Sequence, residues 1–155
     1  MTIRPIQEGD VPSVVSLILR NWDEVMLKHH SPSTVAKFRA KVTHDGVKRQ
    51  MEQKRILVVE RDGEVVATGA LANFGSTDEP MHTVSQFFVR PDLHSQGIGK
   101  ALLHHLIGLA RDQGIRQLHV PSSRNAIPFY QRFGFSPDAD QPSLGDEITW
   151  MTMAI

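Results

Sequence analysis

A glycine-rich turn joins an extended segment directly to a helical one at residues 89–103, VRPDLHSQGIGKALL. The segment before it, TVSQFFV, is rich in β-formers and ends at Arg90-Pro91. The segment after it carries apolar residues at helical spacing and ends at Gly114. IRQLHV then resumes a strand pattern. Residues 84–120 therefore predict a βαβ unit, in which two parallel strands are joined by a right-handed crossover.

This turn predicts an anion site made of backbone groups. The first amides of a helix have no acceptor within the helix, and the helix dipole adds partial positive charge there. Strand–turn–helix junctions of this kind bind phosphate groups in several protein classes. We therefore expect the amides of residues 96–100 to bind a phosphate-bearing ligand.

The remaining segments predict an α/β domain with a mixed sheet. Residues 2–6 alternate as a strand, and residues 8–22 form a helix with Asp10 as its N-cap. Ser31 caps a second helix, and residues 44–54 form a third. Two β-rich runs flank Asp62-Gly63, a strong signal for a type I′ hairpin. After the βαβ unit come a short helix in NAIPFYQRFGF, capped by Asn125 and stopped by Gly134, and a last strand in EITWMTMAI.

Composition narrows the function classes. The chain has 155 residues, a length that suits one domain spanning residues 1–155. It contains no cysteine, which excludes disulfides and any thiol nucleophile. The formal net charge is zero, so no overall field attracts nucleic acid or membrane. Neither a signal peptide nor a membrane-spanning run is found, and a cytoplasmic location is the resulting expectation.

Two common nucleotide motifs do not fit the turn. A Walker A loop needs glycine where His94 stands and Ser or Thr where Ala101 stands. A dinucleotide fingerprint needs Gly or Ala where Leu102 stands, and its domain does not begin with helices and a hairpin.

The stretch instead resembles the acyl-CoA-binding motif of the GCN5-related N-acetyltransferases, the GNAT family. That motif is a strand ending in Val-x-Pro, then Arg/Gln-x-x-Gly-x-Gly/Ala, then an apolar helix, and NAIPFYQRFGF is similar to a later motif of the family. The match covers about residues 56–135. It implies a single GNAT-type domain with a mixed, mostly antiparallel sheet, a central parallel pair and flanking helices. One position departs: His94 stands where the family usually has Arg or Gln, and can still donate to phosphate.

The resemblance implies acetyl-CoA as co-substrate and an amine as acceptor. It assigns cofactor binding to the strand before the turn, the turn itself and the later motif: Phe87, Phe88, Val89, His94, Ser95, Gln96, Gly97, Ile98, Gly99, Lys100, Asn125 and Phe129. The backbone N–H of Phe88 or Val89 is expected to polarise the thioester carbonyl. Tyr130, the only tyrosine, falls where the family commonly places a general acid; otherwise it is a core aromatic.

The general base is not evident. Many family members carry a glutamate on the strand before the turn, where this chain has Ser85 and Gln86. Glu79 and His82 lie just upstream and are the candidates, acting directly or through water. Without cysteine, direct attack by the amine on bound acetyl-CoA is expected.

Three functions remain possible from the sequence. The chain acetylates a small-molecule or peptide amine, it acetylates a protein lysine or N-terminus, or it is a non-catalytic acyl-CoA-binding module. Residues 37–55 carry seven Lys or Arg, either as a solvated helix face or as a contact for an acidic substrate. Acidic loop residues favour a cationic amine: Asp78, Glu79, Asp138, Asp140, Asp146 and Glu147. No metal is expected, since the paired histidines His29-His30 and His104-His105 do not share a helix face. A homodimer through the last strand also stays open.

Overall fold

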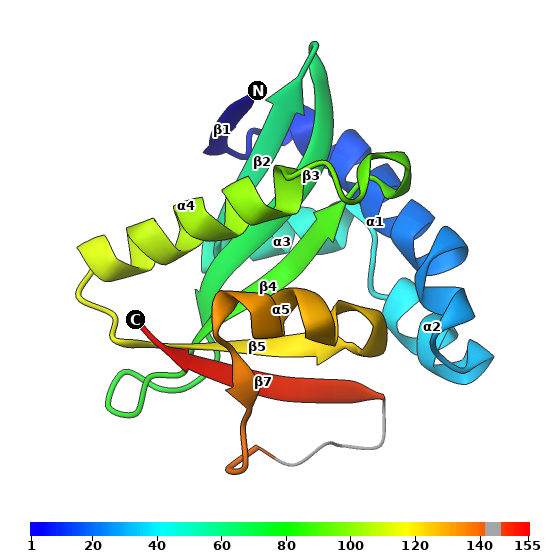
Figure 1. The fold of residues 1–155 in the computed structure, drawn as a ribbon. Coiled ribbons are helices and arrows are strands. Elements are labelled where there is room, and N and C mark those ends of the chain that lie inside the picture. The colour runs from blue at the N-terminus through cyan, green and yellow to red at the C-terminus, as the bar shows by residue number, and fades with distance from the viewer. Residues whose placement is uncertain (142–146) are drawn as a thin grey trace.

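The computed structural model describes residues 1–141 and 147–155, so Asp146 lies outside the described residues. Strands and helices follow the predicted order (Figure 1). The strands are β1 (Thr2–Pro5), β2 (Arg55–Arg61), β3 (Glu64–Asn73), β4 (His82–Val89), β5 (Gln117–Ser123), β6 (Ser136–Pro137) and β7 (Ile148–Ala154). The α-helices are α1 (Val11–Glu24), α2 (Pro32–Arg39), α3 (His44–Gln53), α4 (Ile98–Asp112) and α5 (Ile127–Phe133). Short 3₁₀ turns are η1 (Glu8–Asp10), η2 (Met26–Lys28), η3 (Pro91–Leu93) and η4 (Arg124–Ala126).

The strands form one seven-stranded sheet in the order β1-β2-β3-β4-β5-β7-β6. Only β4 and β5 pair in parallel; the other neighbours are antiparallel. This confirms the predicted α/β class and the predicted central parallel pair. The β2–β3 hairpin turns at Asp62 (φ 54°) and Gly63 (φ 78°), the positive angles that a type I′ turn requires.

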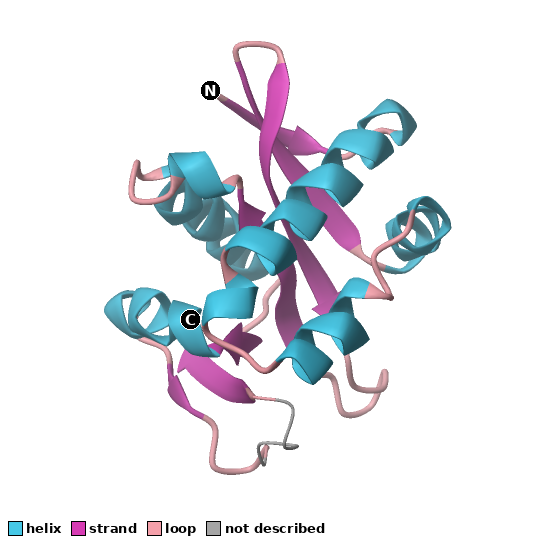
Figure 2. Ribbon diagram, turned by 90° about the vertical axis from the view of Figure 1, so that its right-hand side faces the viewer, coloured by secondary structure: helices cyan, strands magenta, loops and turns pink. Residues whose placement is uncertain are grey.

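Helices cover both faces of the sheet, and each face has its own apolar core (Figure 2). On one face, α4 and α5 pack through residues such as Leu102, Leu106 and Tyr130. On the other face, α1, α2 and α3 pack around Trp22 and Val58. Among the described residues, no helix combines the length and apolarity needed to cross a bilayer.

Asp10 and Ser31 are both predicted as helix caps, with different outcomes. Ser31 caps α2 as expected, since its hydroxyl accepts from the Thr34 N–H at 3.3 Å. Asp10 precedes α1, but its side chain makes no capping bond to that helix. Its carboxylate accepts instead from both terminal nitrogens of Arg4 at 2.8 and 3.0 Å, and from the Gln7 N–H at 2.8 Å. Asp10 therefore occupies the predicted N-cap position of α1 without a capping bond to that helix, because its carboxylate ties the helix entry back to β1.

Replacing Asp10 with asparagine is expected to lower the free energy of unfolding by about 1 kcal/mol, since the Arg4 pair is partly solvent-screened. The Arg4 hydrogen bonds hold the pKa of the Asp10 carboxyl below its usual value. The contribution is therefore fully present above the unfolded-state pKa of about 3.9 and is lost as pH falls through the folded-state pKa. Urea unfolding at pH 7 and pH 3 checks this. The difference in the free energy of unfolding between variant and parent should be smaller at pH 3 than at pH 7. The control Asp78→Asn, in an exposed loop, should leave the free energy of unfolding unchanged at both pH values. A gap as large at pH 3 as at pH 7 contradicts the ion-pair explanation.

Candidate active site

The two parallel strands diverge immediately after they meet. Their pairing consists of the single register position Thr83↔His119, and beyond it β4 and β5 separate (Figure 1). The β5 side of β4 therefore lacks a neighbouring strand from Val84 to Val89. Backbone groups on that side are available to a ligand that lies along the strand.

A bulge in β4 lies at this opening. The register against β3 shifts between Thr68 and Ala70, and Gln86 has a positive φ of 49°. Beyond the bulge, Phe87 and Phe88 point to opposite faces of the sheet, as successive strand residues do. The Phe87 ring contacts Phe129 and Tyr130 at centroid distances of 5.8 and 6.2 Å, whereas the Phe88 ring lies 6.3 Å from Trp22. The opening thus has an aromatic wall on each face.

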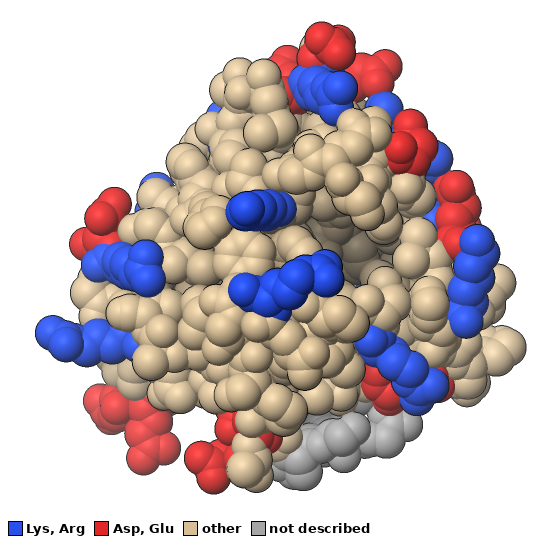
Figure 3. All heavy atoms as spheres, viewed as in Figure 1, with Lys and Arg blue, Asp and Glu red and all other residues tan. Residues whose placement is uncertain are grey.

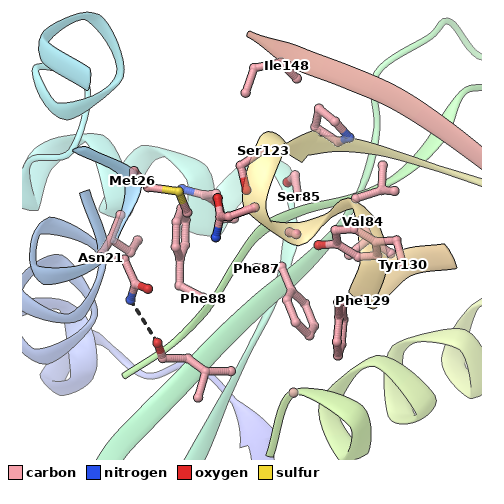
Figure 4. Close-up of a pocket in the computed structure, with 18 of the residues that line it drawn as sticks. Asn21, Met26, Val84, Ser85, Phe87, Phe88, Ser123, Phe129, Tyr130 and Ile148 are labelled. Atoms are coloured by element: carbon pink, nitrogen blue, oxygen red, sulfur yellow. Dashed lines mark hydrogen bonds between the residues drawn. The ribbon is translucent and has the colours of Figure 1, made fainter. Parts of the chain in front are cut away.

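A cavity of about 1070 Å³ passes through this opening and reaches both faces (Figure 4). On one face it is bordered by the glycine turn, α4 and α5, and on the other by α1, α3 and the segment that follows α2. Figure 3 shows the hollow on the first face, with Lys and Arg side chains beside it and acidic side chains toward the periphery. Among the described residues lining the cavity, none is Asp or Glu.

The glycine turn has the geometry of an anion site. Ser95 and Gly97 both adopt left-handed backbone angles, with φ of 65° and 86°, and Gly97 occupies the N-cap position of α4. The first hydrogen bond of the helix after this turn is donated by the Ala101 N–H to the Gly97 carbonyl oxygen. The amides of Ile98, Gly99 and Lys100 precede it and have no acceptor within the helix. The turn is exposed, as phosphate binding requires.

His94 makes a contact that its sequence position did not reveal. Its Nε2 lies 2.8 Å from the Val89 carbonyl oxygen, so Nε2 carries the proton and donates. The free ring atom is then Nδ1, which can donate to a phosphate only when the imidazole is protonated. His94 therefore connects the turn to the end of β4.

Val89 presents its backbone toward the opening. The Arg90 N–H donates to the Val66 carbonyl on β3, and neighbouring strand residues alternate in direction. The Val89 N–H and C=O therefore face away from β3. The Asn21 side chain confirms this direction, since its Nδ2 donates to the Val89 carbonyl at 3.0 Å (Figure 4). Of the two amides predicted to polarise a thioester, the one on Val89 has the required direction.

Tyr130 lies at the wall of the cavity, with only 4% of its surface exposed. Its ring makes edge contacts with Phe87, Phe129 and Phe135 at 5.3–6.2 Å between centroids. Figure 4 shows its hydroxyl directed toward the space between β4 and β5. Burial raises the pKa of this phenol, so it stays protonated at neutral pH. The residue is thus both a core aromatic and a proton donor facing the cavity.

Asn125 does not cap the short helix as predicted. The N-cap residue of α5 is Ala126, and Asn125 lies within η4. Its side chain lines the cavity, and its Oδ1 is buried without a hydrogen-bond partner among the described residues. An unpaired buried oxygen is unfavourable, so the wall here suits a ligand N–H.

The two candidate bases are not brought to this cavity. Glu79 is exposed in the loop between β3 and β4 and is not among the lining residues. His82 begins β4, before the pairing of Thr83 with His119, and borders a separate, smaller hollow. The opening lies at the other end of the strand. The structure therefore gives neither residue a contact with the reacting end of the site.

The acidic loop residues do not line the cavity either. The Asp138 carboxylate accepts from His119 at 3.1 Å, and Glu147 accepts from Ser31 and Thr34. Among the described residues, no group of three or more His, Asp or Glu side chains could hold a metal ion.

Other lining residues lie outside the two motifs. The family resemblance implies acceptor contacts from about Trp22 to Phe38 and from Phe74 to His82, and Trp22, Met26, Phe38 and Phe74 do line the cavity. Asn21, Lys41 and Lys54 were not singled out from the sequence. Apart from Phe74, these residues come from α1, η2, α2 and the segments that directly follow α2 and α3: Asn21, Trp22, Met26, Phe38, Lys41 and Lys54. The basic run at residues 37–55 was the one sequence signal for the two lysines, and its cations have two different environments in the structure. Arg39 and Lys48 form surface ion pairs with Asp23 and Glu8, whereas Lys41 and Lys54 line the cavity.

Comparisons with known proteins agree on one family. The model of the acetyltransferase (GNAT) domain matches residues 26–155. An amino-acid acetyltransferase of Yersinia pestis is 33% identical over 88 residues, which cover 57% of this chain but only 19% of that relative. A GCN5-related N-acetyltransferase from Rhodopseudomonas palustris superposes with a TM-score of 0.82 at 18% identity, covering 99% of this chain and 95% of the other. The PaiA N-acetyltransferase of Thermoplasma acidophilum, solved with coenzyme A, gives 0.81 at 15% identity over the full length of both.

Proposed function

Since the chain belongs to the GNAT family of acetyltransferases, we propose that it transfers an acetyl group from acetyl-CoA directly to a primary amine of a small molecule or peptide. The observation that carries the proposal is the cavity through the β4–β5 opening. It joins an exposed anion-binding turn on one face to an aromatic chamber on the other. Two reactants entering from opposite faces would meet at the opening, next to Val89 and Tyr130.

The residues on the α4 face suit acetyl-CoA. The amides of residues 96–100 would hold its pyrophosphate, with Lys100 beside them and with His94 and Ser95 shaping the turn. The unpaired side of β4 from Phe87 to Val89 would align the pantetheine arm. Gly99 leaves space there, since a Cβ atom at its position would lie 3.4–3.6 Å from Val89 and Phe129. The orphan Asn125 oxygen would accept an amide N–H of the same arm.

Three groups of this chain would perform the chemistry. The Val89 N–H would donate to the thioester carbonyl oxygen as that oxygen gains negative charge. The amine nitrogen forms a bond to the acetyl carbon, and the carbon–sulfur bond breaks. Tyr130 would give its phenol proton to the leaving thiolate and regain one from solvent. The amine loses its proton to solvent, and a cavity wall whose described residues include lysines but no carboxylate favours the neutral amine.

In the proposed mechanism solvent, rather than an upstream side chain, takes the proton of the amine. Glu79 and His82 stay outside the proposed mechanism, because neither lines the cavity. The cavity wall supports catalysis over passive acyl-CoA binding, since it holds a buried proton donor that mere binding would not need. We also propose that residues 1–155 act as one N-acetyltransferase domain, and that the protein works in the cytoplasm.

The test is thiol release from acetyl-CoA across a panel of amines, amino acids, polyamines and peptides. A thiol-reactive dye reports only released CoA, because the chain has no cysteine. We expect turnover with free small amines and, by intact mass, no acetylated enzyme when the acceptor is omitted. Turnover on protein substrates alone would favour a protein-modifying enzyme. Tight CoA binding without turnover on any acceptor would overturn the proposal in favour of a binding module.

A further inference from the structure

The half of the cavity on the α1–α3 face has a distinct chemical character. We call it the acceptor chamber and define it by Trp22, Phe38, Lys41, Lys54 and Phe74, all of which line the cavity. Trp22 and Phe38 stack with their ring centroids 5.3 Å apart and their planes 6° from parallel. Phe74 packs edge-on against Trp150 at 6.1 Å. Flat aromatic walls of this kind suit an apolar or aromatic side group.

The chamber carries positive charge, and its described lining residues include no carboxylate. Lys54 Nζ lies 3.3 Å from the Ser85 hydroxyl and 5.3 Å from the centre of the Phe74 ring. Lys41 Nζ lies 5.5 Å from the centre of the Phe38 ring. Within the described part of the chain, neither ammonium group has an ion-pair partner, although most other cations of the same basic run are paired or exposed outside the cavity.

Lys54 is the better placed of the two for binding an anion. Its side chain is half-buried, and this burial lowers the pKa of its ammonium group. A desolvated ammonium with only a hydroxyl and a ring beside it is stabilised when a carboxylate arrives. The neighbouring Ser85 hydroxyl can donate to the same carboxylate.

Resting on the function proposed above, we propose that the acceptor is an amino acid with an apolar or aromatic side chain, whose carboxylate binds Lys54 while its side chain lies against the aromatic walls. Lys41, beside Phe38, adds a second positive charge to the chamber. This binding mode selects against polyamines, because their additional ammonium groups would meet Lys41 and Lys54 with no carboxylate between them. It also disfavours amines that lack a carboxylate, since Lys54 would then stay unpaired.

Four ligands of matched size test the proposal: L-phenylalanine, L-phenylalaninamide, 2-phenylethylamine and spermidine. Each is assayed by thiol release and, independently of turnover, by quenching of tryptophan fluorescence in the presence of CoA. The chain has two tryptophans, and both Trp22 and Trp150 line the cavity. We expect kcat/KM for L-phenylalanine to exceed that for the amide at least tenfold, with no measurable turnover of spermidine.

Lys54→Met separates charge from shape, since methionine keeps a long apolar side chain against Phe74. It should lower kcat/KM and affinity for L-phenylalanine about tenfold or more and leave those for the amide within about twofold. Lys48→Met is the matched control: Lys48 lies on the neighbouring α3, is exposed and does not line the cavity. This control variant should change neither kcat/KM nor affinity for L-phenylalanine or its amide.

The outcomes distinguish this inference from the function on which it rests. Equal use of L-phenylalanine and its amide, or a preference for spermidine, overturns the carboxylate site while the acetyltransferase proposal stands. Carboxylate-dependent quenching that Lys54→Met removes, without any thiol release, supports the site and overturns the transferase. No quenching by L-phenylalanine and no turnover overturn both. Turnover confined to peptides with a free N-terminus overturns the amino-acid acceptor.

Discussion

Replacing Tyr130 with phenylalanine is expected to lower kcat about 100-fold while leaving the affinity for CoA within about twofold. The substitution removes only the hydroxyl, so the edge contacts of the ring with Phe87, Phe129 and Phe135 persist. The leaving thiolate would then have no proton donor from this wall of the cavity. Steady-state kinetics together with calorimetric titration of CoA measure the two quantities separately.

A packing control and a pH profile sharpen this result. Phe135→Leu loosens the same aromatic cluster without removing a proton, so it should reduce stability more than kcat. Because burial raises the pKa of Tyr130, its deprotonation should not cause any fall in kcat below about pH 10. Unchanged kcat in Tyr130→Phe would remove Tyr130 from the mechanism and leave it as a core aromatic.

Replacing Gly99 with aspartate is expected to weaken CoA binding at least 100-fold. Gly99 lies in the first turn of α4, where the amides have no acceptor within the helix. A carboxylate there would accept from those amides and repel a pyrophosphate group. The fold should persist, since an acidic side chain at a helix N-terminus is favourable and the position has room for a Cβ atom.

The control for this change is Gly108→Asp on the same helix. A Cβ atom at Gly108 has no heavy atom within 4 Å, and the residue does not line the cavity. We expect CoA to bind the control within about threefold of the parent. Calorimetric titration of CoA and thermal unfolding of both variants provide the comparison. Equal loss of affinity in the two variants, or none in Gly99→Asp, would place the pyrophosphate elsewhere.

Local signals in the sequence predicted most of the fold. The Asp62-Gly63 turn, the Ser31 cap and the glycine turn before α4 all depend on residues within a few positions of one another. Such motifs act through backbone angles and nearby hydrogen bonds, so the chain around them is sufficient. Asp10 occupies the N-cap position of α1, but its side chain makes no capping bond to the helix, for the opposite reason. Arg4, brought close by β1, competes for its carboxylate.

The candidate site was predicted unevenly. The proposed acyl-CoA side is carried by two continuous motifs, and its predicted residues other than Gln96 and Ile98 border the cavity together. His82 is close to the glycine turn in sequence, but it lies at the opposite end of β4 from the turn. An extended strand places residues that are near in sequence far apart in space. Asn125 was predicted as the cap of the short helix, but the N-cap residue of α5 is Ala126, one position later. The Asn125 oxygen therefore makes no capping bond.

The sequence by itself determined the element order, the hairpin, the glycine turn and the family, because each is encoded in a short continuous stretch. The tertiary structure alone decided where β4 and β5 part, and which side chains meet there. Trp22, Lys41, Lys54 and Phe74 come from four separate segments, and nothing in their individual contexts marks them as neighbours. They form one chamber because the helices of the α1–α3 face pack against the same end of the sheet, a long-range arrangement that no local pattern contains.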